Sequence, residues 1–255
     1  MLSDNSPVSM LPQSSAGVRF DWGVLGARAL TTETSVVVVV DVLSFCTAVS
    51  VAVARGTAVL PIPFGDESAA QVARDRDAVL AAGRRGATPE HPWSLSPAAL
   101  LSAPVVPRLL LPSPNGSTIS ALASGTVVAA CLRNASAVAG WLWHQGHCTA
   151  ANPTVVVAAG ECWPDGSLRP AVEDLLGAGA VMAALADHGA SLSAEAQVTV
   201  AAYRGITHLA TALRGCASGQ ELIGSGFAED VEVASALDAD TVVPVLCGGA
   251  FTAVV

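Results

Sequence analysis

Short apolar runs alternate with amphipathic segments along most of the chain, and the clearest run is the series of five valines at Val36–Val40. A run that is apolar at every position predicts a strand buried on both faces, because β-branched residues favour extended backbone. Asp41 follows directly, so we expect its carboxylate to lie where the buried strand ends. Parallel α/β sheets bind ligands outside the carboxyl ends of their strands, which makes Asp41 the first candidate active-site residue.

The same alternation continues towards the C-terminus. Apolar runs predict strands at residues 18–20, 36–40, 58–62, 109–111, 126–130, 154–159 and 241–246. Helical spacing predicts helices at residues 47–54, 66–82, 134–143, 171–187, 194–213 and 216–237. Strands that alternate with helices in this way predict a three-layer α/β/α fold with a mainly parallel sheet.

We divide the predicted fold into three parts. Residues 1–17 are polar and rich in turn-forming residues, which is typical of a loose tail. Residues 18–190 form the α/β domain, and residues 191–255 form a smaller, mostly helical C-terminal lobe of the same unit. The long segment at residues 84–107 is rich in Pro and Ser, and a loop of this length is commonly positioned over a binding site.

The charge of the chain excludes one class of partner. Twelve basic residues, all of them arginine, stand against 21 acidic residues, for a net charge of −9. No basic stripe is present to overcome the repulsion from a phosphate backbone, so we expect no nucleic acid partner. A small anionic metabolite fits this balance if a metal ion or a few arginines supply local positive charge. The oligomeric state stays open, with a homodimer among the alternatives.

Membrane insertion and secretion are also disfavoured. Residues 35–54 are long and apolar enough to resemble a membrane span. Asp41 inside that segment would cost roughly 2.5–3.5 kcal/mol, and adjacent valines favour a strand over a helix. The six cysteines contain no CxxC pair, and most lie in or beside apolar segments. We therefore expect reduced thiols and a cytoplasmic protein without a membrane segment.

Polar side chains gather in three turns that follow predicted strands. These turns are at residues 41–47, 113–118 and 160–174, and parallel strands would bring them to the same edge of the sheet. In the second turn, Asn115 and Gly116 precede a helix, and Ser117 adds a hydroxyl beside the exposed backbone amides. This turn is a candidate phosphate site, and an ordinary helix-capping turn is the alternative.

The third turn leads into two adjacent carboxylates, Glu173 and Asp174, in the first turn of a helix. Stabilisation of that helix end is one interpretation. The flanking residues are apolar, however, so at least one carboxylate is expected to be buried beside a cation. With Asp41, the two would make an oxygen-rich site without sulfur or histidine, which is the kind that Mg²⁺ prefers.

Taken together, the segments DVLSFCTAVSVAVARG, LLLPSPNGSTISAL and VVVAAGECWPDGSLRPAVEDLLGAG resemble the 2-phosphosulpholactate phosphatase family. The resemblance implies an α/β-fold, Mg²⁺-dependent phosphatase in the route to coenzyme M. It implies catalytic and metal-binding roles for Asp41, Glu173 and Asp174. Substrate contacts would come from Ser44, Thr47, Asn115, Gly116, Ser117 and Glu161.

The chain departs from the family pattern at two places. Ser44 stands where the family usually has an arginine, and Thr47 is displaced by one residue. The family's Gly-Glu-Arg segment reads Gly83-Arg84-Arg85, and its Asn-Ser-Pro segment reads Leu95-Ser96-Pro97. An anion contact is therefore lost at residue 44, and a basic residue replaces an acidic one at residue 84.

The leading hypothesis is a metal-dependent hydrolase that removes phosphate from a small anionic hydroxy acid, 2-phosphosulpholactate or a relative. Water is the expected nucleophile, and direct attack by Asp41 is the alternative. Two other functions stay open: a non-catalytic anion-binding protein on the same fold, and a phosphatase recruited to a different metabolite, with Arg84 and Arg85 near a different acid group.

Overall fold

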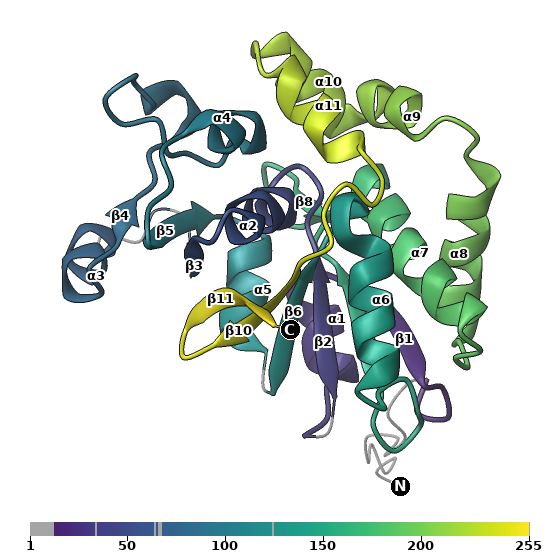
Figure 1. The fold of residues 1–255 in the computed structure, drawn as a ribbon. Helices are drawn as coiled ribbons and strands as arrows, with labels where there is room; N and C mark the ends of the chain where they lie inside the picture. Colours follow the sequence, from purple (N-terminus) through teal and green to yellow (C-terminus); the bar gives the residue numbers. More distant parts are fainter. Residues whose placement is uncertain (1–12, 34, 64, 66–67, 124, 255) are drawn as a thin grey trace, which may run out of the picture.

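Nine strands form one central sheet among the residues that the computed structural model describes, namely 13–33, 35–63, 65, 68–123 and 125–254 (Figure 1). In spatial order the strands are β1 (Val18–Trp22), β7 (Thr154–Ala158), β2 (Val36–Val40), β6 (Thr126–Ala130), β10 (Val243–Cys247), β11 (Ala250–Val254), β3 (Ala58–Pro63), β5 (Arg108–Ser113) and β4 (Val79–Leu80). A separate hairpin pairs β8 (Glu161–Cys162) with β9 (Leu168–Arg169). The predicted mainly parallel α/β architecture is confirmed.

The sheet consists of two parallel blocks. The strands β1, β7, β2 and β6 are parallel to one another, and so are β3, β5 and β4. The antiparallel hairpin β10–β11 lies between the blocks and pairs with β6 on one side and β3 on the other. The C-terminal residues therefore complete the main sheet, and only the helical part of the predicted lobe at 191–255 lies outside it.

Helices cover both faces of the sheet. Their bounds are α1 (Gly23–Leu30), α2 (Phe45–Ala54), α3 (Ala69–Asp75), α4 (Pro97–Ser102), α5 (Gly116–Leu122), α6 (Ala135–His144), α7 (Val172–Asp187), α8 (Ala194–Gly205), α9 (Leu209–Gly215), α10 (Ala217–Gly224) and α11 (Ala228–Ser235). Short 3₁₀ turns occupy Arg84–Gly86 and Leu132–Asn134. Helices α1 and α5 contact each other on one face, while α2, α6 and α7 pack on the other (Figure 1). This arrangement confirms the three-layer prediction.

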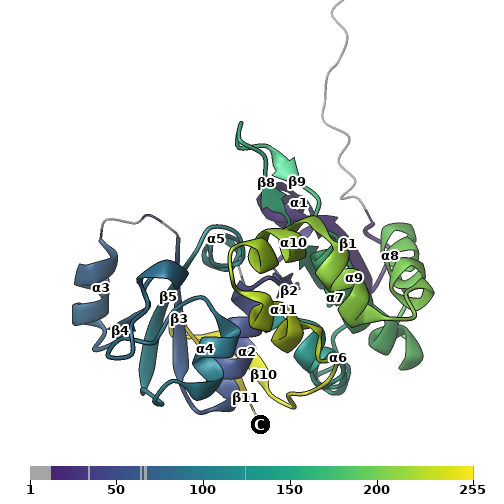
Figure 2. The same ribbon diagram turned by 90° about the horizontal axis from the view of Figure 1, so that it is seen from above.

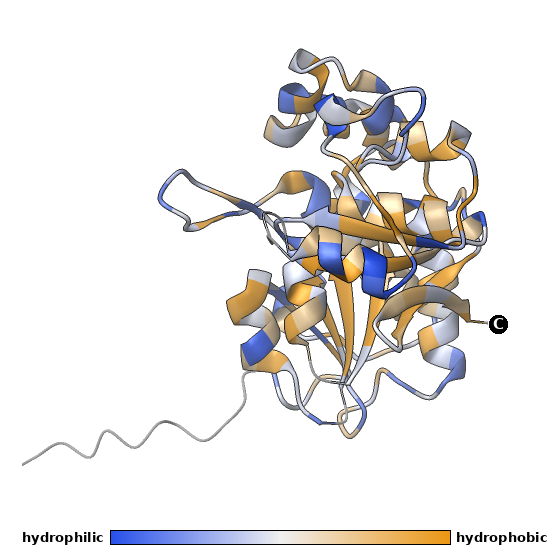
Figure 3. Cartoon of the chain, turned by 90° about the vertical axis from the view of Figure 1, so that its left-hand side faces the viewer, coloured by the Kyte–Doolittle hydropathy of each residue, from blue (hydrophilic) through white to orange (hydrophobic). Residues whose placement is uncertain are grey.

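The core lies around β2. Val37–Val40 have no exposed surface, and the hydropathy colouring shows the central strands as continuously apolar (Figure 3). A Cβ atom at Gly177 would lie 2.6 Å from Val42, so glycine allows α7 to pack closely on the end of β2. None of the helices in the described ranges is long and apolar enough to cross a bilayer.

Two local predictions are corrected, and a third concerns a segment that the structure describes only in part. The helix predicted at residues 66–82 ends at Asp75, because Asp77 adopts a positive φ of 49° and Val79–Leu80 then pair with β5. The segment at 84–107 contains a 3₁₀ turn and α4, and α4 packs against α2 and α11 (Figure 2). Residues 1–12 of the predicted tail lie outside the described residues, whereas Gln13 exchanges two hydrogen bonds with the backbone of Phe20.

Candidate functional site

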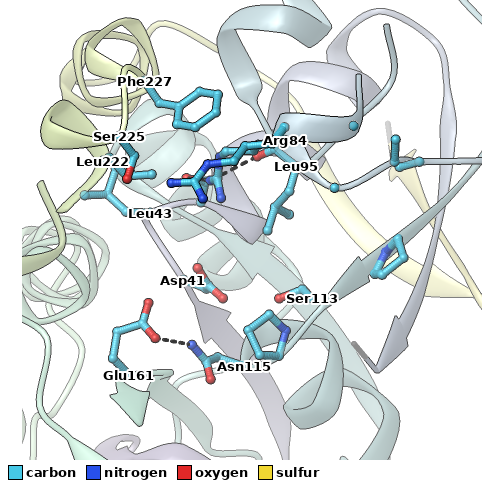
Figure 4. Close-up of a pocket in the computed structure, with 18 residues that line it drawn as sticks. Asp41, Leu43, Arg84, Leu95, Ser113, Asn115, Glu161, Leu222, Ser225 and Phe227 are labelled. Carbon is cyan, nitrogen blue, oxygen red and sulfur yellow. Dashed lines mark hydrogen bonds between the residues drawn. The ribbon is translucent and has the colours of Figure 1, made fainter. Parts of the chain in front are cut away.

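A cavity of about 530 Å³ opens at the carboxyl end of β2 (Figure 4). The strand ends contribute Asp41, Ser113, Asn115 and Glu161, and Leu43 and Ser44 follow β2. The segment at residues 81–86 and Leu95 form another wall, and Leu222, Ser225 and Phe227 cover the cavity from α10 and the loop that follows it. The predicted position of the site, at the edge where the strands end, agrees with this cavity.

Asp41 is held by backbone amides from two segments. Its Oδ1 accepts a hydrogen bond from Phe45 N at 3.0 Å, and its Oδ2 accepts one from Gly116 N at 2.9 Å. Any Cβ at residue 116 would lie 2.5 Å from the Phe45 ring, so the approach requires glycine. Burial raises the pKa of Asp41, the two amides oppose this shift, and the charge of Glu173 adds to it. The carboxylate is thus fixed in position and costly to ionise.

Glu161 and Asn115 face Asp41 from the other strand ends. Asn115 Nδ2 donates to Glu161 Oε2 at 3.0 Å, which joins the β5–α5 turn to the β8–β9 hairpin (Figure 4). Burial raises the pKa of Glu161 to about 7, and the charge of Asp41 contributes, while the Asn115 hydrogen bond opposes the rise. Glu161 can therefore hold or release a proton near neutral pH. We call Asp41, Asn115 and Glu161 the acidic pole of the cavity.

Arg84 supplies positive charge on the opposite side of the cavity (Figure 4). Its Nε donates to Asp230 Oδ2 at 3.1 Å, and its Nη2 donates to Ser44 Oγ at 2.6 Å and to Leu95 O at 3.3 Å. Its guanidinium also lies 5.8 Å from the centre of the Phe227 ring. We call Ser44, Arg84 and Asp230 the basic pole.

Asp230 is the buried anchor of the basic pole. The residue is only 1% exposed, and its Oδ1 accepts hydrogen bonds from Ser96 Oγ at 2.5 Å and from Ala98 N at 3.1 Å. The aspartate thereby ties α11 to both Arg84 and the start of α4. Because all of these partners are far from residue 230 in the chain, no local sequence signal indicated its role.

Asp174 is buried and accepts hydrogen bonds from two backbone amides. Its Oδ1 accepts from Val42 N at 2.7 Å and its Oδ2 from Gly160 N at 2.9 Å, so the carboxylate ties α7 to the ends of β2 and β7. Asp174 does not line the cavity, and neither does the buried Glu173. Burial raises the pKa of Asp174, and Asp41 and Glu173 contribute. The predicted burial of the pair is confirmed, and its metal-binding role stays a prediction.

The hydroxyl groups of Thr47 and Ser117 also point away from the cavity. Both residues have no exposed surface. Thr47 Oγ1 donates to Val42 O at 2.7 Å, and Ser117 Oγ donates to the carbonyls of Ile62 and Ser113. The amide of Gly116 is used by Asp41. These three residues use the named groups in internal hydrogen bonds, and the phosphate contacts predicted for them stay predictions. Ser44, Asn115 and Glu161 line the cavity.

The metal-binding role predicted for Asp41, Glu173 and Asp174 stays a prediction. In the described part of the chain, no group of three or more His, Cys, Asp or Glu side chains is arranged to hold a metal ion. The chemistry of the acidic pole nevertheless fits a hard cation, because Asp41 raises the pKa of Glu161 and a cation would relieve that repulsion. Mg²⁺ commonly takes one or two carboxylates together with water and substrate phosphate. Asp41 and Glu161 fit that role better than Glu173 and Asp174.

Residues 27–249 match the family model of 2-phosphosulpholactate phosphatase, which covers most of the 255-residue sequence. No curated protein matches the chain. The matched range includes both poles of the cavity.

Proposed function

The chain belongs to the 2-phosphosulpholactate phosphatase family, whose members are phosphoric monoester hydrolases, and from this premise we propose that it hydrolyses the phosphate ester of a small anionic hydroxy acid. The substrate is 2-phosphosulpholactate or a relative. One observation carries the proposal: two carboxylates from different strand ends, Asp41 and Glu161, face one cavity at the edge of the sheet where such enzymes bind ligands.

Glu161 is the proton-transfer group in this proposal. A carboxyl group with a pKa near 7 can both accept and release a proton at neutral pH, and it is ionised while it holds a cation. As the oxygen of water forms its bond to phosphorus and the ester P–O bond breaks, ionised Glu161 accepts a proton from that water, and the departing alkoxide takes a proton from solvent. Asn115 holds Glu161 in position through the 3.0 Å hydrogen bond and keeps its second amide proton for a phosphate oxygen.

Asp41 orients the reacting groups. Each of its oxygens already accepts one backbone hydrogen bond, which lowers its nucleophilicity and favours water as the attacking group. Asp41 and Glu161 would together hold Mg²⁺, and the bound ion would withdraw charge from the ester phosphate. The fixed position of Asp41 would keep the attacking water close to phosphorus.

We propose that the protein works in a reducing compartment, the cytoplasm. All six cysteines are free thiols, and four of them, Cys46, Cys131, Cys148 and Cys216, are buried. Burial raises the pKa of Cys131 to about 11 and that of Cys216 to about 12, so these thiols are inert packing groups.

The decisive experiment is phosphate release from a panel of phosphorylated hydroxy acids that includes 2-phosphosulpholactate, assayed with Mg²⁺ and then with EDTA. We expect release that depends on Mg²⁺ and disappears in Asp41→Asn. Release that persists in EDTA would refute the metal proposal alone. A folded, Mg²⁺-loaded protein that binds these esters without releasing phosphate would instead be an anion-binding protein.

A further inference from the structure

We propose that Arg84 binds a second acid group of the substrate, a carboxylate or a sulfonate, and thereby selects phosphate esters that carry such a group. The inference rests on the proposed function, because it concerns which ester enters the same cavity. Arg84 lies across the cavity from Glu161 and Asn115, with Asp41 between them in the view of Figure 4. A substrate with two anionic groups would place its phosphate beside Asn115 and the cation proposed at the acidic pole, and its second acid group at Arg84.

The hydrogen bonds of Arg84 leave part of its guanidinium unused. A guanidinium has five N–H donors. Nε is engaged by Asp230, and Nη2 is engaged by Ser44 and Leu95. Within the described ranges, Nη1 makes no hydrogen bond. Its two N–H groups are therefore the donors that remain for an anion in the cavity.

The anchoring of Arg84 favours anion binding by its remaining N–H groups. Asp230 and Ser44 fix two of its three nitrogens, so little side-chain entropy remains to be lost on binding. Leu95, Leu222 and Phe227 surround it with apolar surface on the cavity wall. A hydrogen bond to an anion is stronger in such surroundings than in water.

Arg133 shows how a purely structural arginine differs. Its Nε and Nη2 donate to the two carboxylate oxygens of Asp240, and its Nη1 donates to Val233 O. All three nitrogens are engaged, and Arg133 does not line the cavity. Arg84 instead lines the candidate site, and its Nη1 has no hydrogen-bond partner among the described residues.

A site built to bind an acid group rejects an analogue that lacks one, because the donors are then left desolvated and unpaired. The acidic pole does not supply this discrimination, since it would interact with the phosphate that all of the esters share. Arg84 is therefore a specificity residue and not a proton-transfer group.

The test compares matched esters in wild type and Arg84→Lys. Lactate 2-phosphate and isopropyl phosphate differ by a carboxylate in place of a methyl group, and the phosphate ester of 2-hydroxypropanesulfonate supplies the sulfonate. Lysine keeps the charge beside Asp230 but has three donors instead of five. We expect kcat/KM for at least one acid-bearing ester to fall about 10- to 100-fold, mainly through KM. The kcat/KM for isopropyl phosphate should change less than about twofold. The acid-bearing ester with the higher kcat/KM in the wild type shows whether Arg84 binds a carboxylate or a sulfonate.

Arg214→Lys is the matched control, because Arg214 pairs with Glu232 on the surface and should leave the ratio between esters unchanged. An equal loss for all esters would place Arg84 on the phosphate and overturn the inference. The ratio of kcat/KM between an acid-bearing ester and isopropyl phosphate can stay unchanged in Arg84→Lys if lysine replaces the lost contact. The double variant Arg84→Met/Asp230→Asn then decides, because it removes the positive charge and leaves no buried charge unpaired. An unchanged ratio there as well would overturn the inference.

Calorimetric binding separates this inference from the proposed function. If the wild type hydrolyses none of the esters, the phosphatase proposal fails, and titration with the two acid-bearing esters and isopropyl phosphate decides the role of Arg84. Tighter binding of an acid-bearing ester that is lost in Arg84→Lys would support the inference. Equal binding of all esters, or no binding, would refute it.

Discussion

The two poles of the cavity differ in how the chain builds them. The acidic pole comes from the ends of β2, β5 and β8, where each functional residue follows or belongs to a strand. The basic pole comes from the turn after β2, the segment after β4 and α11, and its anchor Asp230 lies 146 residues from Arg84. A parallel sheet brings strand ends together by its own topology, whereas the basic pole depends on packing between distant segments.

The largest expected effect is at the acidic pole. Asp41→Asn should lower kcat/KM for the preferred ester by about 10²–10⁴-fold, because it removes the charge that orients the reacting groups. The free energy of unfolding should fall by only about 1 kcal/mol, since the asparagine oxygen can still accept one of the two amide hydrogen bonds. Steady-state kinetics and urea unfolding measure the two effects.

Asp174→Asn is the matched control for Asp41→Asn, because Asp174 also accepts two backbone amides but lies outside the cavity wall. We expect a similar loss of stability without a comparable loss of kcat. Equal kinetic losses in both variants would show that Asp174 belongs to the catalytic machinery after all.

At the basic pole, Asp230→Ala should lower the free energy of unfolding by about 3 kcal/mol. The change leaves Arg84, Ser96 and the amide of Ala98 without their buried acceptor. Combining it with Arg84→Met in a double-mutant cycle measures the coupling of the pair. The exposed pair Arg214–Glu232 serves as the comparison and should show much weaker coupling. Similar coupling for both pairs would mean that Asp230 is not an anchor.

A smaller effect is expected from pH. The pKa of Glu161 rises from a reference value of 4.5 to about 7 on folding, so the folded state favours the protonated form. Its contribution to stability is complete below about pH 4.5 and is lost as the pH rises through about 7. In EDTA, the free energy of unfolding of Glu161→Gln should therefore rise relative to that of the wild type by about 2–3 kcal/mol between pH 4.5 and pH 8. Urea unfolding at several pH values tests this, and parallel curves for the two proteins would contradict it.

The smallest expected effect is that of the metal ion. At pH 8, Mg²⁺ at ten times its dissociation constant should stabilise the wild type by about 1.4 kcal/mol. The gain should be reduced in Glu161→Gln and retained in Glu173→Gln, because only Glu161 lines the cavity. Thermal unfolding with and without Mg²⁺ makes the measurement. The opposite ranking of the two variants would restore Glu173 as the ligand.

The sequence leaves the roles of several predicted site residues open for one physical reason. Small polar residues at strand ends can bind a ligand, or they can form hydrogen bonds with buried backbone N–H and C=O groups. The same sequence pattern predicts both roles. Thr47 and Ser117 donate to carbonyls, and Asp174 accepts from amides. Buried backbone groups require partners, and in a turn that packs against a helix the side chains supply them.

What the sequence determined by itself is the sheet and the edge at which the site lies. The valines of β2, the strand-to-helix units and the polar turns are local patterns. Hydrophobic periodicity and the preference of β-branched residues for buried strands are enough to predict them. Only the tertiary structure decided that the hairpin β10–β11 joins two parallel blocks, that Asp174 holds the backbone, and that Arg84 meets Ser44 and Asp230. These contacts join residues far apart in the chain, and their partners are selected by packing of the whole fold and not by neighbouring residues.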